Sequence, residues 1–196
     1  MKKILMIVLM TTMSMGVLAQ NEVGSMTIQP KGGFGLATLT NVPKAEMTGV
    51  GMFGGELEYA LKEKMSIALG LNFDMLGYGM DNTDGIKDWH TSLNYLAVPA
   101  VVNFYVYKGL ALKAGLQPAL LLSANESFKQ GDDKHDTKVT SSYNSFDLCI
   151  PLGISYEFSR VVIDARYLLG LTKVNKHGET CRNSVIMITT GYKFKL

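Results

Sequence analysis

Charged side chains recur at alternate positions inside otherwise apolar segments of this 196-residue chain. Glu56 and Glu58 are two residues apart, and so are Asp164 and Arg166. Since alternate residues of a β-strand share one face, each pair would point to the same side of a sheet. The residues that fit this pattern are Glu56, Glu58, Asp74, Lys113, Asp147, Glu157, Asp164, Arg166, Lys193 and Lys195.

Acidic and basic groups on one enclosed face can do two kinds of chemistry. They can line an ion-selective lumen or a proton relay, or they can pair with one another across a filled interior. An unpaired buried charge is costly, and an eight-stranded barrel is only wide enough for its own side chains. We therefore favour a lumen charge network of paired side chains, with eight members: Glu56, Glu58, Asp74, Lys113, Asp147, Glu157, Asp164 and Arg166.

The elements that would position these charges are long strands, best seen in 145–173. Large apolar residues occupy every second position of 146–158, and the alternation resumes after Ser159-Arg160. Strict period two predicts strands, and a two-residue break between them predicts an antiparallel hairpin. Ordinary strands have about 5–6 residues, whereas tilted membrane-crossing strands need about 9–11. The segment is typical of a membrane barrel.

The same pattern recurs along the whole chain. It predicts strands at 27–38, 49–61, 65–75, 93–106, 110–122, 145–158 and 161–173, and a last strand ending at Leu196. The connections alternate between long and short, with the short ones at 62–64, 107–109 and 159–160. Even strand numbers, short periplasmic turns and long external loops characterise outer-membrane barrels. The predicted fold is an all-β, eight-stranded, antiparallel up-and-down transmembrane β-barrel.

Side-chain volume decides which face of these strands points outward. The bulky residues of the apolar faces are too many for so narrow an interior, so we expect apolar side chains outside and polar ones inside. Two aromatic belts are expected at the membrane interfaces. The periplasmic belt would contain Tyr59, Phe104, Tyr107, Tyr156, Phe158, Tyr192 and Phe194, and the external belt Phe73, Tyr78, Trp89, Tyr95, Tyr143 and Phe146.

Residues 1–19 have the features of a secretory signal peptide. Lys2 and Lys3 precede an apolar run at 4–10, and Val17-Leu18-Ala19 forms a small-residue cleavage site before Gln20. Residues 20–196 would form the barrel domain. Cleavage removes two of the 19 basic residues and leaves 17 against 17 acidic ones. No basic excess then remains to suggest a nucleic-acid partner.

Three segments carry a resemblance to a known family. L-N-Y-L-A-V-P-A-V-V-N-F-Y at 93–105, L-K-A-G-L-Q-P-A-L-L-L-S-A at 112–124 and D-A-R-Y-L-L-G-L-T at 164–172 resemble the PorT-like outer-membrane β-barrel domain, common in Bacteroidetes. That family usually has an acidic residue where Ala97 stands and a basic one where Asn103 stands. The resemblance implies residence in the outer-membrane bilayer.

The last residues, T-T-G-Y-K-F-K-L, resemble the signal by which barrel-assembly machinery recognises a C-terminal strand, except that Leu196 replaces the usual terminal aromatic residue. The resemblance therefore also implies that this machinery is a partner during insertion.

The histidines and cysteines offer few catalytic possibilities. His90, His135 and His177 lie in predicted external loops without metal-ligand spacing, so no metal or cofactor is expected. His90-Thr91-Ser92 resembles the H-x-S element of lipid A deacylase barrels, which also need an acidic partner and a lipid-facing serine. Cys149 and Cys181 form either one disulfide in an oxidising compartment or two free thiols.

These observations predict a non-enzymatic integral protein of the outer membrane. Its function would be structural or based on surface interactions, with external loops, especially 125–144, facing ligands or partners. A narrow porin-like channel for small solutes is the first alternative. A lipid-modifying barrel enzyme is the second, and a soluble periplasmic barrel is the third.

Overall fold

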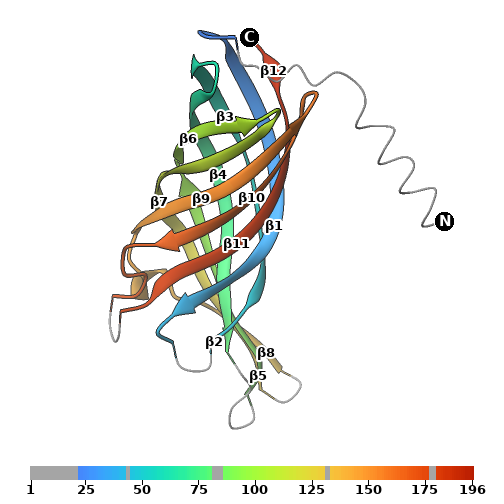
Figure 1. Cartoon of the computed structure of the whole chain (residues 1–196). Helices are drawn as coiled ribbons and strands as arrows, with labels where there is room; N and C mark the ends of the chain where they lie inside the picture. Colours follow the sequence, from blue (N-terminus) through green and yellow to red (C-terminus); the bar gives the residue numbers. More distant parts are fainter. Residues whose placement is uncertain (1–21, 43–44, 81–85, 131–132, 177–179) are drawn as a thin grey trace, which may run out of the picture.

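The computed structural model describes residues 22–42, 45–80, 86–130, 133–176 and 180–196. Figure 1 shows these residues as one tall antiparallel barrel. The predicted signal peptide at 1–19, its cleavage site before Gln20, and His177 lie outside the described residues. The described part of the chain contains no helix long and apolar enough to cross a bilayer.

The strands pair with their sequence neighbours around a closed ring. Their bounds are β1 (Met26–Thr40), β2 (Ala45–Glu46), β3 (Thr48–Lys62), β4 (Met65–Met80), β5 (Ile86–Ala97), β6 (Ala100–Tyr107), β7 (Leu110–Gln130), β8 (Asp133–Lys138), β9 (Phe146–Phe158), β10 (Val161–Gly170), β11 (Arg182–Tyr192) and β12 (Phe194–Lys195), with one 3-10 turn, η1 (Thr140–Ser142). Pro99 lies between β5 and β6, which together fill one position between β4 and β7. The ring order is β1, β3, β4, β5 with β6, β7, β9, β10 and β11. It confirms the predicted eight-stranded architecture.

The ring closes where the first and last long strands meet. β1 pairs with β11 from Lys31–Gly191 to Thr40–Arg182, and β12 continues the pairing at Thr27–Lys195. A closed ladder satisfies the backbone N–H and C=O groups of the wall internally, which is the requirement for crossing hydrocarbon.

Two short turns and two inward-facing glycines show how local sequence permits this shape. Ser159 and Gly109 adopt positive φ angles of 58° and 75° in the turns before β10 and β7. A Cβ on Gly35 would overlap the backbone of Ile186, and one on Gly115 would overlap that of Ala100. Glycine at these inward positions therefore lets neighbouring strands approach closely in a narrow barrel.

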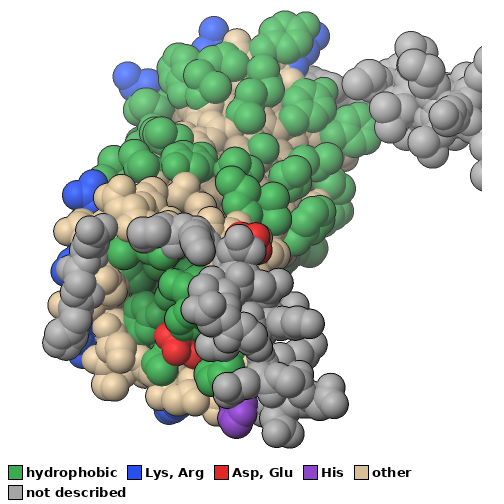
Figure 2. Space-filling model, turned by 90° about the horizontal axis from the view of Figure 1, so that it is seen from below, with side chains coloured by type: hydrophobic (Ala, Val, Ile, Leu, Met, Phe, Trp, Pro, Cys, Tyr) green, Lys and Arg blue, Asp and Glu red, His purple; other side chains and the backbone are tan. Residues whose placement is uncertain are grey.

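Large apolar side chains cover the outside of the barrel, as predicted. Figure 2, which views the molecule from the end with the long loops, shows hydrophobic side chains spread over the outer surface. Exposed examples from around the ring are Ile28, Phe34, Leu57, Leu69, Val102, Phe104, Leu112, Leu120, Ile154, Ile163, Ile186 and Ile188. In a bilayer this surface would contact lipid chains.

The strands at the long-loop end extend further than the sequence predicted. The expected loop at 125–144 contains the end of β7 and all of β8, which pair from Asn125–Lys138 to Gln130–Asp133. The expected loop near 80–91 is likewise partly strand, since β4 reaches Met80 and β5 begins at Ile86. The extensions of β5 and β7 and all of β8 are rich in polar residues and lack an apolar face, so hydrophobic periodicity could not detect them.

Candidate functional site: the filled lumen

Five charged side chains meet in the middle of the barrel, and we call them the central layer. Arg166 on β10 donates hydrogen bonds from Nε and Nη2 to the two carboxylate oxygens of Asp164, both at 2.8 Å. Asp164 also pairs with Lys113 on β7 at 2.8 Å. Glu56 on β3 pairs with Lys31 on β1, and its Oε1 lies 3.5 Å from Arg166 Nη2. The central layer thus joins four strands through the interior.

A second group crosses the lumen at the end with the short turns, and we call it the short-turn layer. Lys193 Nζ lies 2.8 Å from Glu58 and 2.7 Å from Glu157. Nζ also donates to the Tyr105 hydroxyl at 3.1 Å, and that hydroxyl donates to Glu58 at 2.6 Å. Ser66 completes the group with a 2.5 Å hydrogen bond to Glu58.

The position of Lys193 lets the short-turn layer connect opposite walls of the lumen. Lys193 follows β11, and Tyr105 belongs to β6. In the ring order three strand positions separate β11 from the β5–β6 position in either direction, so the Lys193–Tyr105 hydrogen bond joins opposite walls. A buried lysine with two carboxylate partners is compensated in charge and in hydrogen bonds.

The two remaining predicted charges bind neutral polar side chains. Gln117 donates to Asp74 at 2.8 Å. Asp147 accepts hydrogen bonds from Thr172 at 2.6 Å and from Asn183 at 2.7 Å. All eight residues of the predicted lumen network therefore point inward, but they form separate groups at different heights.

The lumen at the long-loop end contains apolar side chains instead, and we call this group the mouth plug. Its members include Leu39, Met52, Leu76, Tyr78, Leu93, Tyr95, Leu121, Tyr143, Leu168, Val174, Val185 and Met187. The Tyr78 and Tyr143 hydroxyls are 2.9 Å apart, which ties the segment after η1 to β4. Burial of Tyr143, which lies in this loop segment, and its bond to Tyr78 raise the pKa of its hydroxyl.

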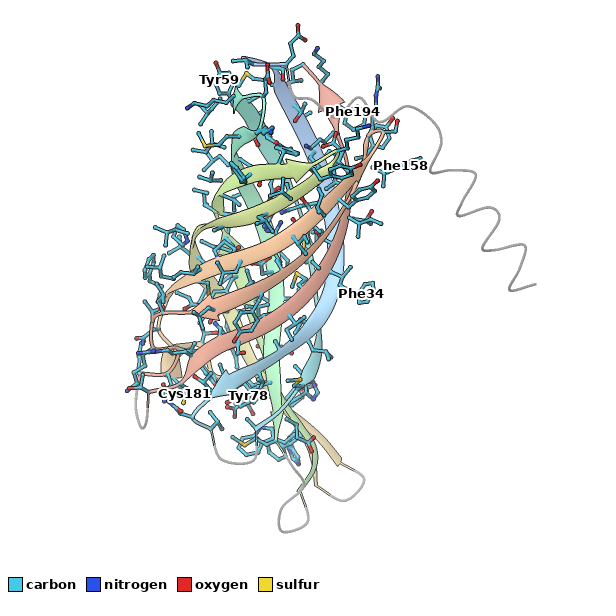
Figure 3. All side chains as sticks on the ribbon, in the orientation of Figure 1. Phe34, Tyr59, Tyr78, Phe158, Cys181 and Phe194 are labelled. Atoms are coloured by element: carbon cyan, nitrogen blue, oxygen red, sulfur yellow. The ribbon has the colours of Figure 1, made fainter. Side chains whose placement is uncertain are left out.

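The mouth plug corrects two predictions. The interior is not polar throughout. Tyr78, Tyr95 and Tyr143, predicted for the external aromatic belt, point inward and are buried. The strand alternation already placed Tyr95 opposite the lipid-facing residues, and proximity to the strand ends was the wrong criterion. Figure 3 shows Tyr59, Phe158 and Phe194 at the short-turn end, as predicted, with Tyr78 at the opposite end.

Lys195 was predicted to face the interior but is exposed. Its side chain retains 63% of its accessible surface and pairs with Glu22 at 2.7 Å. Lys195 lies beyond the level of Lys193, where the wall ends and the alternation no longer separates lipid from lumen. In turn, the prediction omitted Lys31 and Tyr105. Lys31 alternates with Gln29 and Gly33 on the inward face of β1, and this pattern could have identified it.

Cys149 and Cys181 both lie buried in the mouth plug. Cys149 donates a 3.4 Å hydrogen bond from Sγ to Asp147. Both alternatives from the sequence, one disulfide or two free thiols, stay predictions.

His90 and His135 belong to β5 and β8, so the positions predicted as loops are strand extensions. The described residues contain no group of three or more His, Cys, Asp or Glu side chains placed to hold a metal. His90 and Ser92 lie on the outward face of β5, since the alternating Thr91 and Leu93 are buried in the interior. The outward position of Ser92, which the sequence could not establish, is a finding of the structure.

Comparisons with known proteins agree with this architecture. The family model described as "Outer membrane protein beta-barrel domain" matches residues 18–176. The attachment invasion locus protein Ail of Yersinia pestis is similar at 16% identity with a TM-score of 0.53, over 88% of this chain and 100% of Ail. Neisserial surface protein A is similar at 15% identity with a TM-score of 0.50, over 86% of this chain and 97% of that protein. No curated protein matches the sequence.

Proposed function

Because this chain belongs to the outer membrane protein β-barrel domain family, we propose that it is a non-catalytic outer-membrane barrel with a closed lumen. Its function would be to present the long-loop end to ligands or partners. The observation that carries this proposal is the Lys193–Tyr105 hydrogen bond at 3.1 Å between opposite walls. A solute path through the barrel would have to separate these side chains.

Two further layers support a closed lumen. Above the short-turn layer, Arg166 and Glu56 approach each other from β10 and β3, and their side chains are each 4% exposed. Above that, the mouth plug fills the interior with apolar residues. A conducting pore would need to displace charges with two or three partners each and a packed apolar cluster, which costs several kcal/mol.

The long-loop end is suited to a surface role. β7 and β8 form a hairpin that extends beyond the barrel with β5 (Figure 1), and the Tyr143 segment is held across the mouth. Rigid scaffolds with variable loops are the usual arrangement for binding. Ail, which has the same fold, has been solved with a heparin analogue, sucrose octasulfate.

Two finer assignments belong to this proposal. The motifs at 93–105, 112–124 and 164–172 support membership of the PorT-like group. The terminal segment supports insertion by barrel-assembly machinery, since β11 and β12 make the closing contacts with β1.

Presentation of the loops can be tested by epitope insertion. A tag between Gly131 and Asp132, in the β7–β8 connection, should stain on intact cells. A matched tag between Glu63 and Lys64, in the short turn before β4, should stain only after the outer membrane is permeabilised. The reverse pattern would contradict the proposed orientation.

A lipid-modifying enzyme is the second candidate, favoured by the outward position of His90 and Ser92. Catalysis by a serine requires a base and an orienting acid in hydrogen-bond geometry. If the protein is not an enzyme, the His90→Ala and Ser92→Ala variants should leave the lipid A of the host unchanged, as measured by mass spectrometry. Loss of an acyl chain in the parent strain that either substitution restores would establish the enzyme instead.

A further inference from the structure

The outward face of the wall becomes polar towards the long-loop end. On β4 and β5 the outward residues are apolar as far as Met75 and Leu96, and beyond them they are glycines or polar residues such as Ser92. Ser92 is on the outward face, since Thr91 and Leu93, which flank it, are buried in the interior. Hydrocarbon offers polar side chains no partners. This part of the wall therefore lies beyond the lipid-facing band.

The register of the strands sets these residues side by side in two rows, which we call the polar rows. Directly paired residues of neighbouring strands share one face of a sheet. The first row crosses from β2 to β8 and the second from β4 to β8. Their members are Glu46, Gly79, His90, Ser127 and Asp136, and then Gly77, Ser92, Asn125 and Lys138.

A cleft accompanies the polar rows where β3 and β4 separate. Pairing between these strands reaches Gly51–Met75, and the next pairing along β4 is Glu46–Gly79, made by β2. Residues 47–50 and 76–78 thus have no ladder pairing with one another, although both segments are described. A cavity of about 1400 Å³ lies here, and every residue of the polar rows lines it.

Glycines give the cleft its depth. Gly49 and Gly51 on β3 line it together with Gly77 and Gly79 of the polar rows. A Cβ on Gly49 would have no atom within 4 Å, and one on Gly79 would meet none nearer than 3.5 Å. The cavity exceeds the about 300–1,000 Å³ that is usual for pockets of small molecules. The cleft therefore has room for a ligand of several linked rings.

The side chains of the cleft offer both donors and acceptors. Asn94, which also lines it, donates a hydrogen bond to Ser123 at 3.0 Å, and Ser127 donates one to Asp136. These cross-strand bonds orient the side chains and leave the amide oxygen of Asn94 and the lone pairs of Ser127 to accept others. A ligand hydroxyl both donates and accepts, so it can bond to carboxylate, amide and ammonium groups alike.

Charge and backbone pairing narrow the class of ligand. Glu46 and Asp136 of the polar rows are acidic and Lys138 is basic, so the cleft has no excess of positive charge for a polyanion. At the polar rows β5 and β7 are each paired on both sides, so neither can add a peptide strand. A ligand over them would be recognised by side chains.

We propose that this cleft binds an uncharged oligosaccharide. Its hydroxyls would bond to Asn94, Asn125 and Ser127 and to the carboxylates of the polar rows. Its rings would lie over the glycines, with their C–H faces against Phe34 and Met75, which line the other edge. This assignment rests on the proposed function, in which the long-loop end meets ligands at the cell surface, and it names the class of ligand.

An array of neutral, sulfated and sialylated oligosaccharides tests the proposal. The full-length protein is applied in micelles of a detergent without a sugar headgroup. Neutral oligosaccharides should bind, and calorimetric titration with the strongest of them should give an affinity that about 0.5 M NaCl leaves unchanged, since salt screens only charges. Binding confined to the sulfated or sialylated sugars, or no binding at all, would overturn the proposal.

Two matched pairs of variants locate the site. Gly49→Leu fills the cleft and should weaken binding about tenfold, whereas Gly55→Leu, on the same face of β3 but outside the cleft, should leave it unchanged. Asn125→Ala removes one hydrogen-bonding group from the polar rows and should weaken binding about fivefold. Ser142→Ala, on the exposed turn η1 outside the cleft, should have no effect.

Folding of each variant is checked by its gel mobility with and without boiling. If Gly49→Leu does not fold, Asn125→Ala, which changes one exposed side chain, provides the comparison with Ser142→Ala. Equal affinity of the test and control variants would overturn the proposal. The epitope tags decide the proposed function separately, because they report the position of the long-loop end whether or not a sugar binds.

Discussion

The central layer and the mouth plug fill the same lumen by opposite means. Arg166, Asp164 and Glu56 are held by charge and hydrogen bonds, each with a specific partner. Leu93, Leu168 and Val185 fill the mouth by shape, and each is no more than 2% exposed. Charges give a fixed geometry but depend on every partner being present, whereas apolar packing loses stability in proportion to the volume removed.

This difference predicts that the two parts of the lumen tolerate substitutions to different extents. The central layer should tolerate almost no single substitution, since each leaves a buried charge behind. The mouth plug should tolerate conservative apolar changes, so the loops that it anchors can vary.

The largest loss of stability is expected for Arg166→Ala. This change leaves Asp164 and Glu56 with fewer cationic partners in a closed interior, and the free energy of unfolding should fall by about 3–5 kcal/mol. Urea unfolding in micelles, followed by circular dichroism, measures it. Arg160→Ala, at the exposed turn before β10, is the control and should be neutral. A loss below about 1 kcal/mol for Arg166→Ala would show that the layer is solvated.

A smaller but still large effect is expected for Leu168→Ala in the mouth plug. The cavity it creates should cost about 2–5 kcal/mol in the same unfolding experiment. Leu169→Ala, one residue further on β10 but 39% exposed on the lipid-facing side, should cost less than half as much. Equal losses for the two variants would contradict the assignment of Leu168 to a packed interior.

The hydrogen bond between the Tyr78 and Tyr143 hydroxyls should contribute modestly to the free energy of unfolding. Tyr78→Phe removes one hydroxyl of the pair and should cost about 1 kcal/mol, because the other loses its buried partner. Adding Tyr143→Phe should cost little more, so the double-mutant cycle should give a coupling of about 0.5–1.5 kcal/mol. Additive losses would indicate that the hydroxyls do not bond in the folded protein.

The smallest effect on stability is expected when the exposed ion pair between Glu22 and Lys195 is removed. The hydrogen bond and charge of Lys195 lower the pKa of Glu22, so Lys195→Ala should raise that pKa towards its ordinary value in an NMR titration. A lowered carboxyl pKa stabilises the fold above the unfolded-state pKa, and this contribution is lost as pH falls through the folded value. Because Glu22 is fully exposed, unfolding at pH 7 should not change measurably. A clear loss there would mean that the pair orders the first strand.

The sequence allowed the ring to be predicted because the bilayer imposes one rule on every strand. Ile163 and Ile154 point outward, whereas Asp164 and Ser155 are buried in the interior. Alternation therefore predicts both the strand and the direction of each side chain. At the long-loop end this rule fails. Leu93 and Tyr95 are inward yet apolar, and their role depends on which loops cover the mouth, which no local pattern encodes.

The sequence predicted which side chains face the lumen, but not which of them pair with one another. Lys193 lies beside Tyr105 because eight strands close with one particular register, and that register brings opposite walls together. The separation of β3 from β4 at Gly49 depends on the same register and has no signature beyond a concentration of glycine.

Single-channel recording tests the closed lumen most directly. The folded wild-type protein is inserted into a planar lipid bilayer beside a known porin as a positive control, and insertion is verified by the gel shift of recovered protein. With Lys193 bonded to Tyr105 across the lumen and the mouth plug above it, the current should stay at the level of the protein-free bilayer. Recurrent current steps of uniform size from the wild-type protein would contradict the account and establish a narrow channel.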